Sequence, residues 1–148
     1  MSPLRFDGRT AIVTGAGGNP GLGRAHALLL AARGANVVVN DIGSAPEMRG
    51  YPAPADAHAV VAEIRAAGGS AVASTHSVAT VEGAEALVRT AIEAFGRIDI
   101  LVNNAAVSVA APVDAMTERD FRHHIDVNLM GAVCCCRAVW PHMRAAGH

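Results

Sequence analysis

The stretch T-A-I-V-T-G-A-G-G-N-P-G-L-G-R, residues 10–24, decides the fold of this chain. It opens with an apolar run at residues 11–13, continues through a loop with five glycines, and leads into an amphipathic helix pattern that starts at Arg24. Glycines let the backbone approach a ligand closely, and the free N–H groups at a helix start favour negative charge. A strand, a glycine loop and a helix in this order are typical of a nucleotide-phosphate site, with an ordinary glycine-rich turn as the alternative.

Apolar runs and helix patterns alternate along the rest of the chain. The expected strands cover residues 10–14, 37–39, 70–75 and 98–102, and the expected helices cover 21–33, 55–67, 81–95 and 117–146. Residues 43–56 are expected to form a loop, and Thr117, with Asp120 three residues on, is the expected N-cap of the last helix. The alternation predicts an α/β fold: a Rossmann-type doubly wound parallel sheet in three layers.

The length of 148 residues fits one domain, residues 1–148, whose sheet stops after the fourth strand and the helix that follows it. Hydrophobic residues make up 51% and aromatic residues only 3%, so the core must pack through Val, Ile, Leu and Ala. With a formal net charge of −1 and no basic stripe, nothing indicates a nucleic-acid partner. We also expect no membrane span, no signal peptide and therefore a cytoplasmic location.

Cysteine and histidine patterns do not indicate a metal site. Cys134, Cys135 and Cys136 are contiguous on a helical pattern, where neighbours point about 100° apart, so they suit neither pairing nor a shared metal. We expect them to be small core residues. His123 and His124 are also adjacent, and no cluster of Cys or carboxylates has ligand spacing, so we expect no bound metal.

Asp41 is the second anchor for a nucleotide. It closes the second expected strand, 18 residues after Gly23. A carboxylate about 20 residues past the glycines accepts hydrogen bonds from the adenosine ribose hydroxyls and repels a 2′-phosphate. We therefore expect NAD in preference to NADP. The alternative is an Asp that merely begins a turn.

Two groups of asparagines point to the same edge of the sheet. Asn103 and Asn104 follow the fourth expected strand, at the carboxyl edge where ligands bind in such folds. Asn128 lies inside the last helical pattern, where asparagine is mildly unfavourable. The adjacent amides have the alternative role of tying down a loop, and Asn128 that of an exposed residue without function.

Together these features resemble the short-chain dehydrogenase/reductase family. The residues that carry the resemblance are Thr14-Gly15, Gly21-Leu22-Gly23, Asp41, Asn103-Asn104-Ala105, and Asp126-Val127-Asn128-Leu129 with Gly131. The resemblance covers essentially the whole chain. It implies a Rossmann fold, a nicotinamide cofactor, and hydride transfer to or from an alcohol or ketone.

The resemblance also implies roles for individual residues. Asn128 would help to build a proton relay by holding a water near the catalytic lysine, and Asn104-Ala105 would lie against the adenosine half of the cofactor. The cofactor-binding positions that it implies are Gly15, Gly17, Gly21, Leu22, Gly23, Asp41, Ile42, Ser77, Val78, Asn104 and Ala105. The helix over 117–146 would pack against a partner subunit and make a homo-oligomer.

Some stretches look more closely like the (3R)-hydroxyacyl-CoA dehydrogenase domains of multifunctional β-oxidation enzymes. They are residues 37–43, 61–64, 68–73 and 95–99. This closer resemblance implies a substrate of the hydroxyacyl-CoA type.

The chain departs from the family pattern at three places near the expected cofactor site. Five residues instead of three separate Gly15 from Gly21, and we expect the longer loop to bind pyrophosphate with rearranged contacts. Ala106 replaces a glycine, which is a mild change unless the backbone there needs a positive φ. Ser77 stands where the family has an Asp near the adenine, and its hydroxyl can still hydrogen-bond the base.

The family's catalytic Ser and its Tyr-x-x-x-Lys pair have no counterpart here. Both lie beyond the fifth strand of the family fold, whereas this sequence stops at residue 148, contains no lysine, and has Tyr51 as its only tyrosine. General acid–base catalysis therefore has no candidate residue, and we expect cofactor binding without turnover.

Two functions from other classes stay open. One is a non-catalytic nucleotide-binding or oligomer-assembly module. The other is a methyltransferase, which also uses a glycine loop and an acidic residue after the second strand. The segments Asn103-Asn104-Ala105 and Asp126-Val127-Asn128 argue against the methyltransferase.

Overall fold

The computed structural model describes residues 4–43 and 55–147. Its elements are β1 (Thr10–Thr14), α1 (Leu22–Ala32), β2 (Asn36–Asn40), α2 (Ala57–Ala66), β3 (Ser70–Ser74), α3 (Val81–Phe95), β4 (Ile100–Val102), α4 (Glu118–His124), η1 (Ile125–Met130) and α5 (Gly131–Ala146). Within the described residues the strands form one parallel sheet in the order β3-β2-β1-β4. The expected Rossmann-type α/β fold is confirmed.

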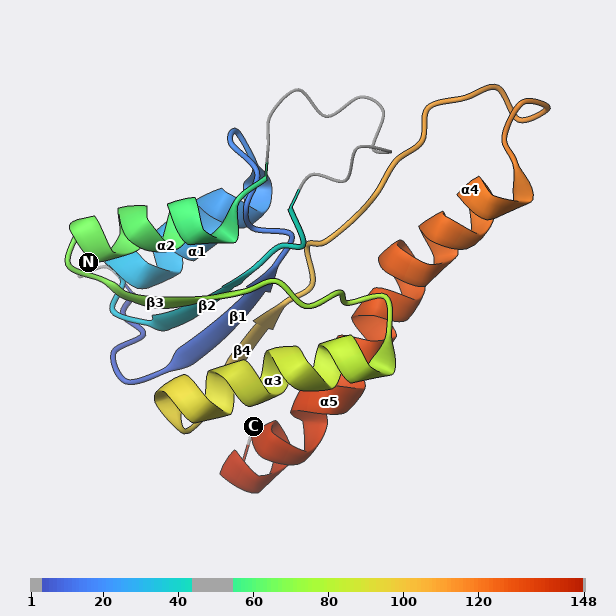
Figure 1. Ribbon diagram of the computed structural model, residues 1–148. Coiled ribbons are helices and arrows are strands. Elements are labelled where there is room, and N and C mark those ends of the chain that lie inside the picture. Colours follow the sequence, from blue (N-terminus) through green and yellow to red (C-terminus); the bar gives the residue numbers. More distant parts are fainter. Residues whose placement is uncertain (1–3, 44–54, 148) are drawn as a thin grey trace.

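Helices cover both faces of the sheet: α1 and α2 lie on one face, and α3 and α5 on the other (Figure 1). The side chains of β2 show how one strand serves both layers. Val37 and Val39 pack into the cluster that contains Val60 and Ile64 of α2, whereas Val38 packs into the cluster that contains Leu87 of α3. Because successive side chains of a strand point to opposite faces, the β-branched run of β2 fills both layers of the core.

All four strands end at the same edge of the sheet. Their last residues are Thr14, Asn40, Ser74 and Val102. Thr14 pairs in register with Asn40, which in turn pairs with Ser74. The segments that leave this carboxyl edge contain most of the predicted cofactor residues, so the topology alone gathers them from distant parts of the sequence.

The helix boundaries follow from short capping residues. Thr117 accepts a hydrogen bond from the Asp120 N–H, and the Asp120 carboxylate accepts one from the Thr117 N–H, which makes a reciprocal capping box. The predicted N-cap is therefore confirmed. Asp56 caps α2 through the His58 N–H, and α3 ends at Gly96 in the left-handed conformation.

One predicted helix contains an unexpected segment, and one predicted boundary is wrong. The single helix expected over 117–146 is interrupted by the π-helical segment η1, in which the wider turn accommodates Asn128 as its side chain binds the loop backbone at Val107. The strand expected over 98–102 begins only at Ile100, because the Asp99 carboxylate, and not a backbone carbonyl, accepts the hydrogen bond of the Thr10 N–H.

The cysteines do not all lie in the core as expected. Cys134 and Cys135 are buried between the sheet and α3, but Cys136 is exposed. Burial, followed by the neighbouring Cys134 and Cys136, raises the pKa of the Cys135 thiol to about 11. Tyr51 and most of the predicted 43–56 loop lie outside the described residues. In the described part of the chain, no helix combines the length and apolar character needed to cross a membrane.

The two ends of β1 provide a matched test of buried hydroxyl groups. Thr10 Oγ1 is buried without a hydrogen-bond partner among the described residues, whereas Thr14 Oγ1 takes part in three hydrogen bonds. We expect Thr10→Val to raise the free energy of unfolding by about 1 kcal/mol and Thr14→Val to lower it by about 2–3 kcal/mol. Urea unfolding of both variants measures the difference, and equal effects of the two substitutions would contradict the assignment.

Candidate functional site

The hydroxyl of Thr14 joins the ends of β1 and β4. Its Oγ1 donates to the Val102 carbonyl at 3.3 Å and accepts from the backbone N–H groups of Asn104 and Ala105, both at 3.0 Å. A hydroxyl offers one donor and two lone pairs, so the hydrogen-bonding capacity of the Thr14 hydroxyl is filled. The segment that follows β4 is thereby fixed against the start of the glycine loop.

The side chain of Asn104 strengthens the same junction. Its Nδ2 donates to the carbonyl oxygens of Thr14 and Gly15, both at 2.9 Å. For the Asn104 side chain, the loop-tying role that the sequence left open is what the structure shows. Asn103 is different, because its side chain is exposed and its Nδ2 contacts Cys136 Sγ at 3.4 Å.

The glycine loop packs so tightly that two of its glycines leave no room for a side chain. Gly15 has a φ of +62°, and a Cβ there would lie 2.6 Å from the Ala105 Cα. A Cβ on Gly23 would lie 2.4 Å from the Gly15 oxygen and 2.5 Å from Asn104 Nδ2. The loop, the start of α1 and the Asn104-Ala105 segment therefore form one packed unit.

The start of α1 lies open at the end of this loop. Gly21 is its N-cap and provides no side-chain hydrogen bond, and Leu22, the first helical residue, is exposed. The first N–H groups of a helix lack partners within the helix, and they attract anions when no side chain caps them. The uncapped start of α1 is thus available to an anion.

Asp41 lies beside the glycine loop, at the end of β2. Its Oδ2 accepts from the Gly17 N–H at 2.9 Å, and its Oδ1 accepts from the Gly43 N–H at 2.9 Å. A carboxylate accepts about four hydrogen bonds, so each oxygen keeps capacity for a further donor. The next residue, Ile42, is exposed. The structure thus places Asp41 and Ile42 together at the edge of the site.

Ser77 and Val78 follow β3 at the same edge of the sheet. Ser77 Oγ accepts from the Ala79 N–H at 3.2 Å, and the Val78 side chain is buried in the core cluster of α3 and α5. Buried Asn40 holds this segment, because its Nδ2 donates to the carbonyls of Ser74 at 3.2 Å and His76 at 2.9 Å. A ligand would therefore meet Val78 through its backbone.

Asn128 fastens the segment that leaves β4. The Val107 N–H donates to Asn128 Oδ1 at 2.8 Å, and Asn128 Nδ2 donates to the Val107 carbonyl at 3.0 Å. The side-chain amide pairs with the backbone as a neighbouring strand would. Ala106, just before Val107, is not among the residues of positive φ, so its replacement of the family's glycine is mild, as predicted.

Sequence reasoning missed Thr14, Asn40 and His124 as parts of this site. Thr14 and Asn40 share a signal that was available: each is a polar residue at the end of a strand that is otherwise apolar and buried. His124 had no such signal, because its partner, the Val109 N–H, is distant in the sequence.

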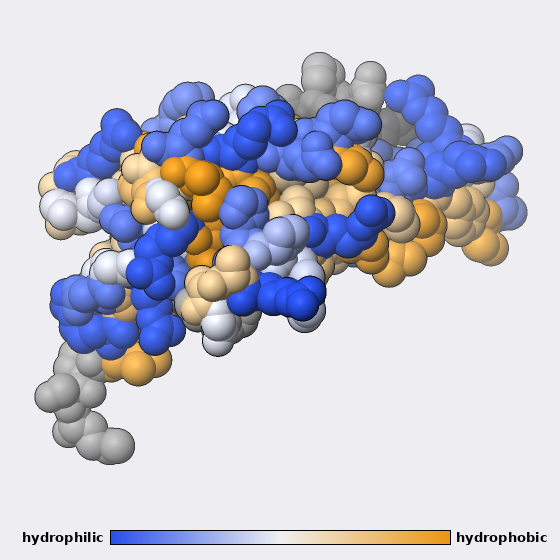
Figure 2. Space-filling model, turned by 90° about the horizontal axis from the view of Figure 1, so that it is seen from below, coloured by the Kyte–Doolittle hydropathy of each residue, from blue (hydrophilic) through white to orange (hydrophobic). Residues whose placement is uncertain are grey.

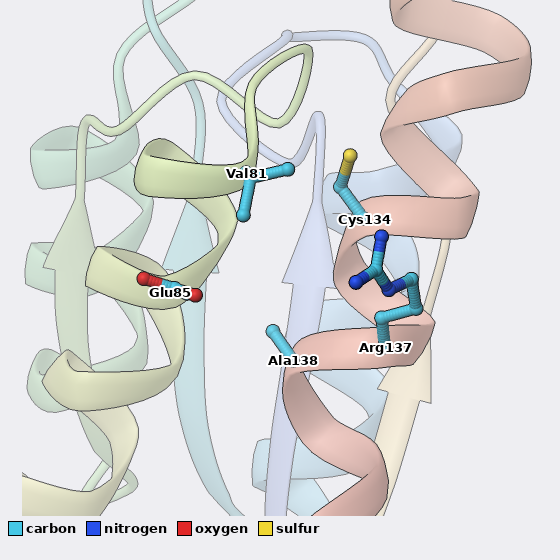
Figure 3. Close-up of a pocket in the computed structure, with 5 residues that line it drawn as sticks. All are labelled: Val81, Glu85, Cys134, Arg137 and Ala138. Carbon is cyan, nitrogen blue, oxygen red and sulfur yellow. The ribbon is translucent and has the colours of Figure 1, made fainter.

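A small pocket lies elsewhere, between α3 and α5. It has a volume of about 100 Å³ and is lined by Val81, Glu85, Cys134, Arg137 and Ala138 (Figure 3). None of the predicted cofactor residues lines it, and ligand pockets usually measure about 300 Å³ or more. Among the described residues, no group of three or more His, Cys, Asp or Glu side chains is placed to hold a metal ion.

A comparison of the chain with known protein families agrees with the features of this site. The site combines a glycine loop after β1, an acidic residue after β2 and an Asn-Asn-Ala segment after β4. The family model described as short chain dehydrogenase matches residues 9–148. The chain belongs to the short-chain dehydrogenase family. This membership accounts for both the fold and the clustering of these residues at the carboxyl edge.

Individual proteins and solved structures are also similar to this short-chain dehydrogenase chain. It is 49% identical over 143 residues to "Peroxisomal multifunctional enzyme type 2" of Mus musculus, covering 97% of this chain and 19% of that protein. Among solved structures it is similar to a short chain dehydrogenase from Mycobacterium avium, with a TM-score of 0.82 and 47% identity, over 94% of this chain and 49% of that one.

A second solved structure was determined with a cofactor bound. Carveol dehydrogenase from Mycobacterium avium in complex with NAD has a TM-score of 0.86 and 29% identity, over 99% of this chain and 53% of that one. The short-chain dehydrogenase chain therefore spans about half the length of these solved structures and about a fifth of the mouse relative.

Two glycines of the loop give a matched test of this packing. A Cβ on Gly23 would meet the atoms described above, whereas a Cβ on Gly18 would meet its nearest atom only at 3.8 Å. We expect Gly23→Ala to lower the free energy of unfolding by about 2–3 kcal/mol and Gly18→Ala to change it by less than about 0.5 kcal/mol. Chemical denaturation measures both, and a tolerated Gly23→Ala would show that the loop is loosely packed.

Proposed function

We propose that this chain is the cofactor-binding part of an NAD-dependent oxidoreductase that transfers hydride between the cofactor and an alcohol or ketone. The observation that carries the proposal is the packed unit of glycine loop, Asp41 and Asn104 at the carboxyl edge of the sheet. Family membership and the NAD complex of a relative with the same fold support it. A bound nicotinamide would supply the hydride donor or acceptor.

Charge around the adenosine end supports NAD over NADP. Asp41 is fixed by two backbone N–H groups and retains acceptor capacity for ribose hydroxyls. The cation next to Gly23 is Arg24, and its guanidinium is engaged with Glu63 of α2 at 2.6 Å. The 2′-phosphate of NADP would thus be repelled by the Asp41 carboxylate. Arg24 would not compensate, because its guanidinium is already paired with the Glu63 carboxylate.

The remaining predicted residues take roles that follow from their positions. Gly15, Gly17, Gly21, Leu22 and Gly23 would face the pyrophosphate, and Ile42, Ser77 and the backbone of Val78 would border the adenine. Ala105 would line the site next to Gly15. For Asn128 we keep the proton-relay role: its side chain is occupied by Val107, which leaves its backbone to hold a water.

Turnover needs groups that this chain does not supply. A general acid–base residue for the substrate hydroxyl has no candidate here, since the sequence has no lysine and its one tyrosine lies far from the Asn128 position along the chain. We therefore propose that these residues bind and orient the cofactor without catalysing the reaction by themselves.

Titration with NADH and NADPH tests the cofactor assignment. We expect saturable NADH binding, with NADPH weaker by roughly ten- to a hundredfold because of repulsion by Asp41. Asp41→Asn should remove most of this preference. Asp56→Asn is the matched control, since Asp56 lies by the same loop but its carboxylate caps α2, which Asn does equally well. Fluorescence of bound NADH and NADPH measures both affinities for wild type and the two variants.

Three results would contradict the assignment. The first is no binding of either dinucleotide by a demonstrably folded chain, which would favour the assembly module. The second is a preference for NADPH, which would reverse the role of Asp41. The third is tighter binding of S-adenosylmethionine than of NADH, which would favour the methyltransferase.

The substrate class is a finer proposal. We propose a 3-hydroxyacyl-CoA-like substrate for the protein to which this chain contributes, on the strength of the stretches 37–43 and 95–99 and the similarity to the mouse multifunctional enzyme. The cytoplasmic location stays a prediction. The mouse relative carries "peroxisomal" in its name, and that word describes the mouse protein.

A second copy of the chain is the partner that we propose for α4 and η1. Phe121, Ile125 and Leu129 recur every four residues, which places them on one face of the helix, and they are 46%, 53% and 55% exposed. Figure 2 shows hydrophobic surface at the end of the molecule where α4 extends away from the sheet. Such an apolar row on a solvent-exposed surface is typical of an interaction site.

Two leucines of nearly equal exposure test this contact. Leu129 on η1 is 55% exposed and Leu29 on α1 is 54% exposed. We expect Leu129→Glu to convert a dimer or tetramer into monomers and Leu29→Glu to leave the oligomer intact, because only Leu129 lies in the apolar row. Sedimentation velocity measures the mass of each protein. Monomeric wild-type protein, or equal effects of the two changes, would refute the proposed contact.

A further inference from the structure

The imidazole of His124 has both ring nitrogens engaged. Its Nε2 lies 3.0 Å from the Val109 backbone nitrogen, which donates, and its Nδ1 lies 2.7 Å from the Asp120 carbonyl oxygen, which accepts. A carbonyl has no proton to give, so Nδ1 must carry one, and Nε2 must keep a lone pair for the Val109 N–H. The contacts thus select the neutral imidazole with its proton on Nδ1.

His124 and Asn128 hold the same segment at two neighbouring points. They lie four residues apart, at the end of α4 and within η1, and they bind the backbone at Val109 and Val107. The two side chains that hold the segment differ chemically. The amide of Asn128 does not titrate, whereas histidine is the side chain whose charge ordinarily changes between pH 5 and 8.

We propose that His124 is a pH-operated latch on the segment that leaves β4. Protonation at Nε2 consumes the lone pair that accepts the Val109 N–H and sets two N–H groups against each other. At acidic pH the segment is then held at Val107 alone, and at neutral pH it is held at both points.

The surroundings contain few groups that could mimic this behaviour. Residues 103–113, on the loop side, include no ionisable side chain. On the helix side, hydrogen bonds from the side chain and backbone of Thr117, with smaller effects of Arg119 and His124, lower the pKa of the Asp120 carboxyl. Asp120 therefore stays ionised between pH 5 and 8.

Five other charged or titratable groups lie nearby in the sequence. Asp114 ends the loop and Asp126 lies in η1, and both are carboxyl groups. Arg122 pairs with Glu118 one helical turn away. His123 is an exposed second histidine directly beside His124, so it needs a control of its own.

The His124 contact affects the candidate cofactor site because the segment that it holds is continuous with residues of that site. The segment held at 107–109 continues directly from Ala105, which packs against Gly15 of the glycine loop. Release at Val109 would loosen the far end of the wall that Asn104 and Ala105 build. This consequence rests on the proposed function, whereas the latch itself does not, so the test below is made without cofactor.

Amide hydrogen exchange of the protein, resolved by NMR, tests the latch. Protection factors corrected for intrinsic exchange are measured from pH 8 to pH 5.5 for Val109, with Val107 as the internal reference. We expect the protection factor of the Val109 amide to fall at least about tenfold with acidification, because the amide loses one hydrogen bond. The protection factor of the Val107 amide should stay constant. Ring chemical shifts at pH 8 should report the Nδ1-protonated form of His124.

Three variants separate the latch from a general effect of acid. His124→Gln keeps a neutral acceptor at the reach of Nε2, so Val109 should stay protected at both pH values. His124→Phe removes the acceptor, so protection should be low throughout. His123→Gln, the neighbouring control, should behave as wild type. Constant protection of Val109 in wild type, an undiminished pH dependence in His124→Gln, or a ring protonated on Nε2 at pH 8 would overturn the proposal.

Discussion

The site depends on the hydroxyl of one buried residue, Thr14. Parallel strands end side by side, but nothing in a sheet ladder fixes the segments that leave it. Thr14 does this for β1 and β4, because its single hydroxyl bonds to Val102 before the junction and to Asn104 and Ala105 after it. Asn104 returns two hydrogen bonds to the carbonyls of Thr14 and Gly15. The glycine loop thereby has a fixed wall on one side.

On its other side the loop is held by β2. The Asp41 carboxylate accepts the Gly17 N–H, and Gly17 in turn accepts from the Asp56 N–H at the start of α2. The Asp41 carboxyl group is therefore held beside the loop in a fixed orientation, a form of preorganisation that would spare a ligand the cost of ordering it. Both contacts form in a loop that is two residues longer than the family pattern.

The segment after β4 and the helix beyond it are coupled in the same manner. Asn128 and His124 each bind backbone groups of residues 107–109, and the helix adopts a π-turn where Asn128 reaches out. Wide turns of this kind often occur at functional sites. The same helical stretch also carries the exposed apolar row of Phe121, Ile125 and Leu129.

Much of this arrangement was determined by the sequence alone. Apolar runs, glycine stops and capping residues predicted the four described strands and α1, α2 and α3 within a few residues, because these are local preferences of the chain. The positions of Gly15, Asp41 and Asn104 just after strand ends were predicted for the same reason, together with the shared edge that parallel strands impose. Asp41 as the determinant of cofactor choice stays a prediction.

Only the tertiary structure decided which partners the polar side chains take. Thr14, Asn40 and His124 bind backbone groups that are distant along the chain, and such contacts leave no periodic pattern in a sequence. The π-turn at Asn128 and the late start of β4 have the same origin, since each follows from a side chain that bonds across the fold. The preference for a helix, strand or turn depends on neighbouring residues, whereas these hydrogen bonds exist only once the chain has folded.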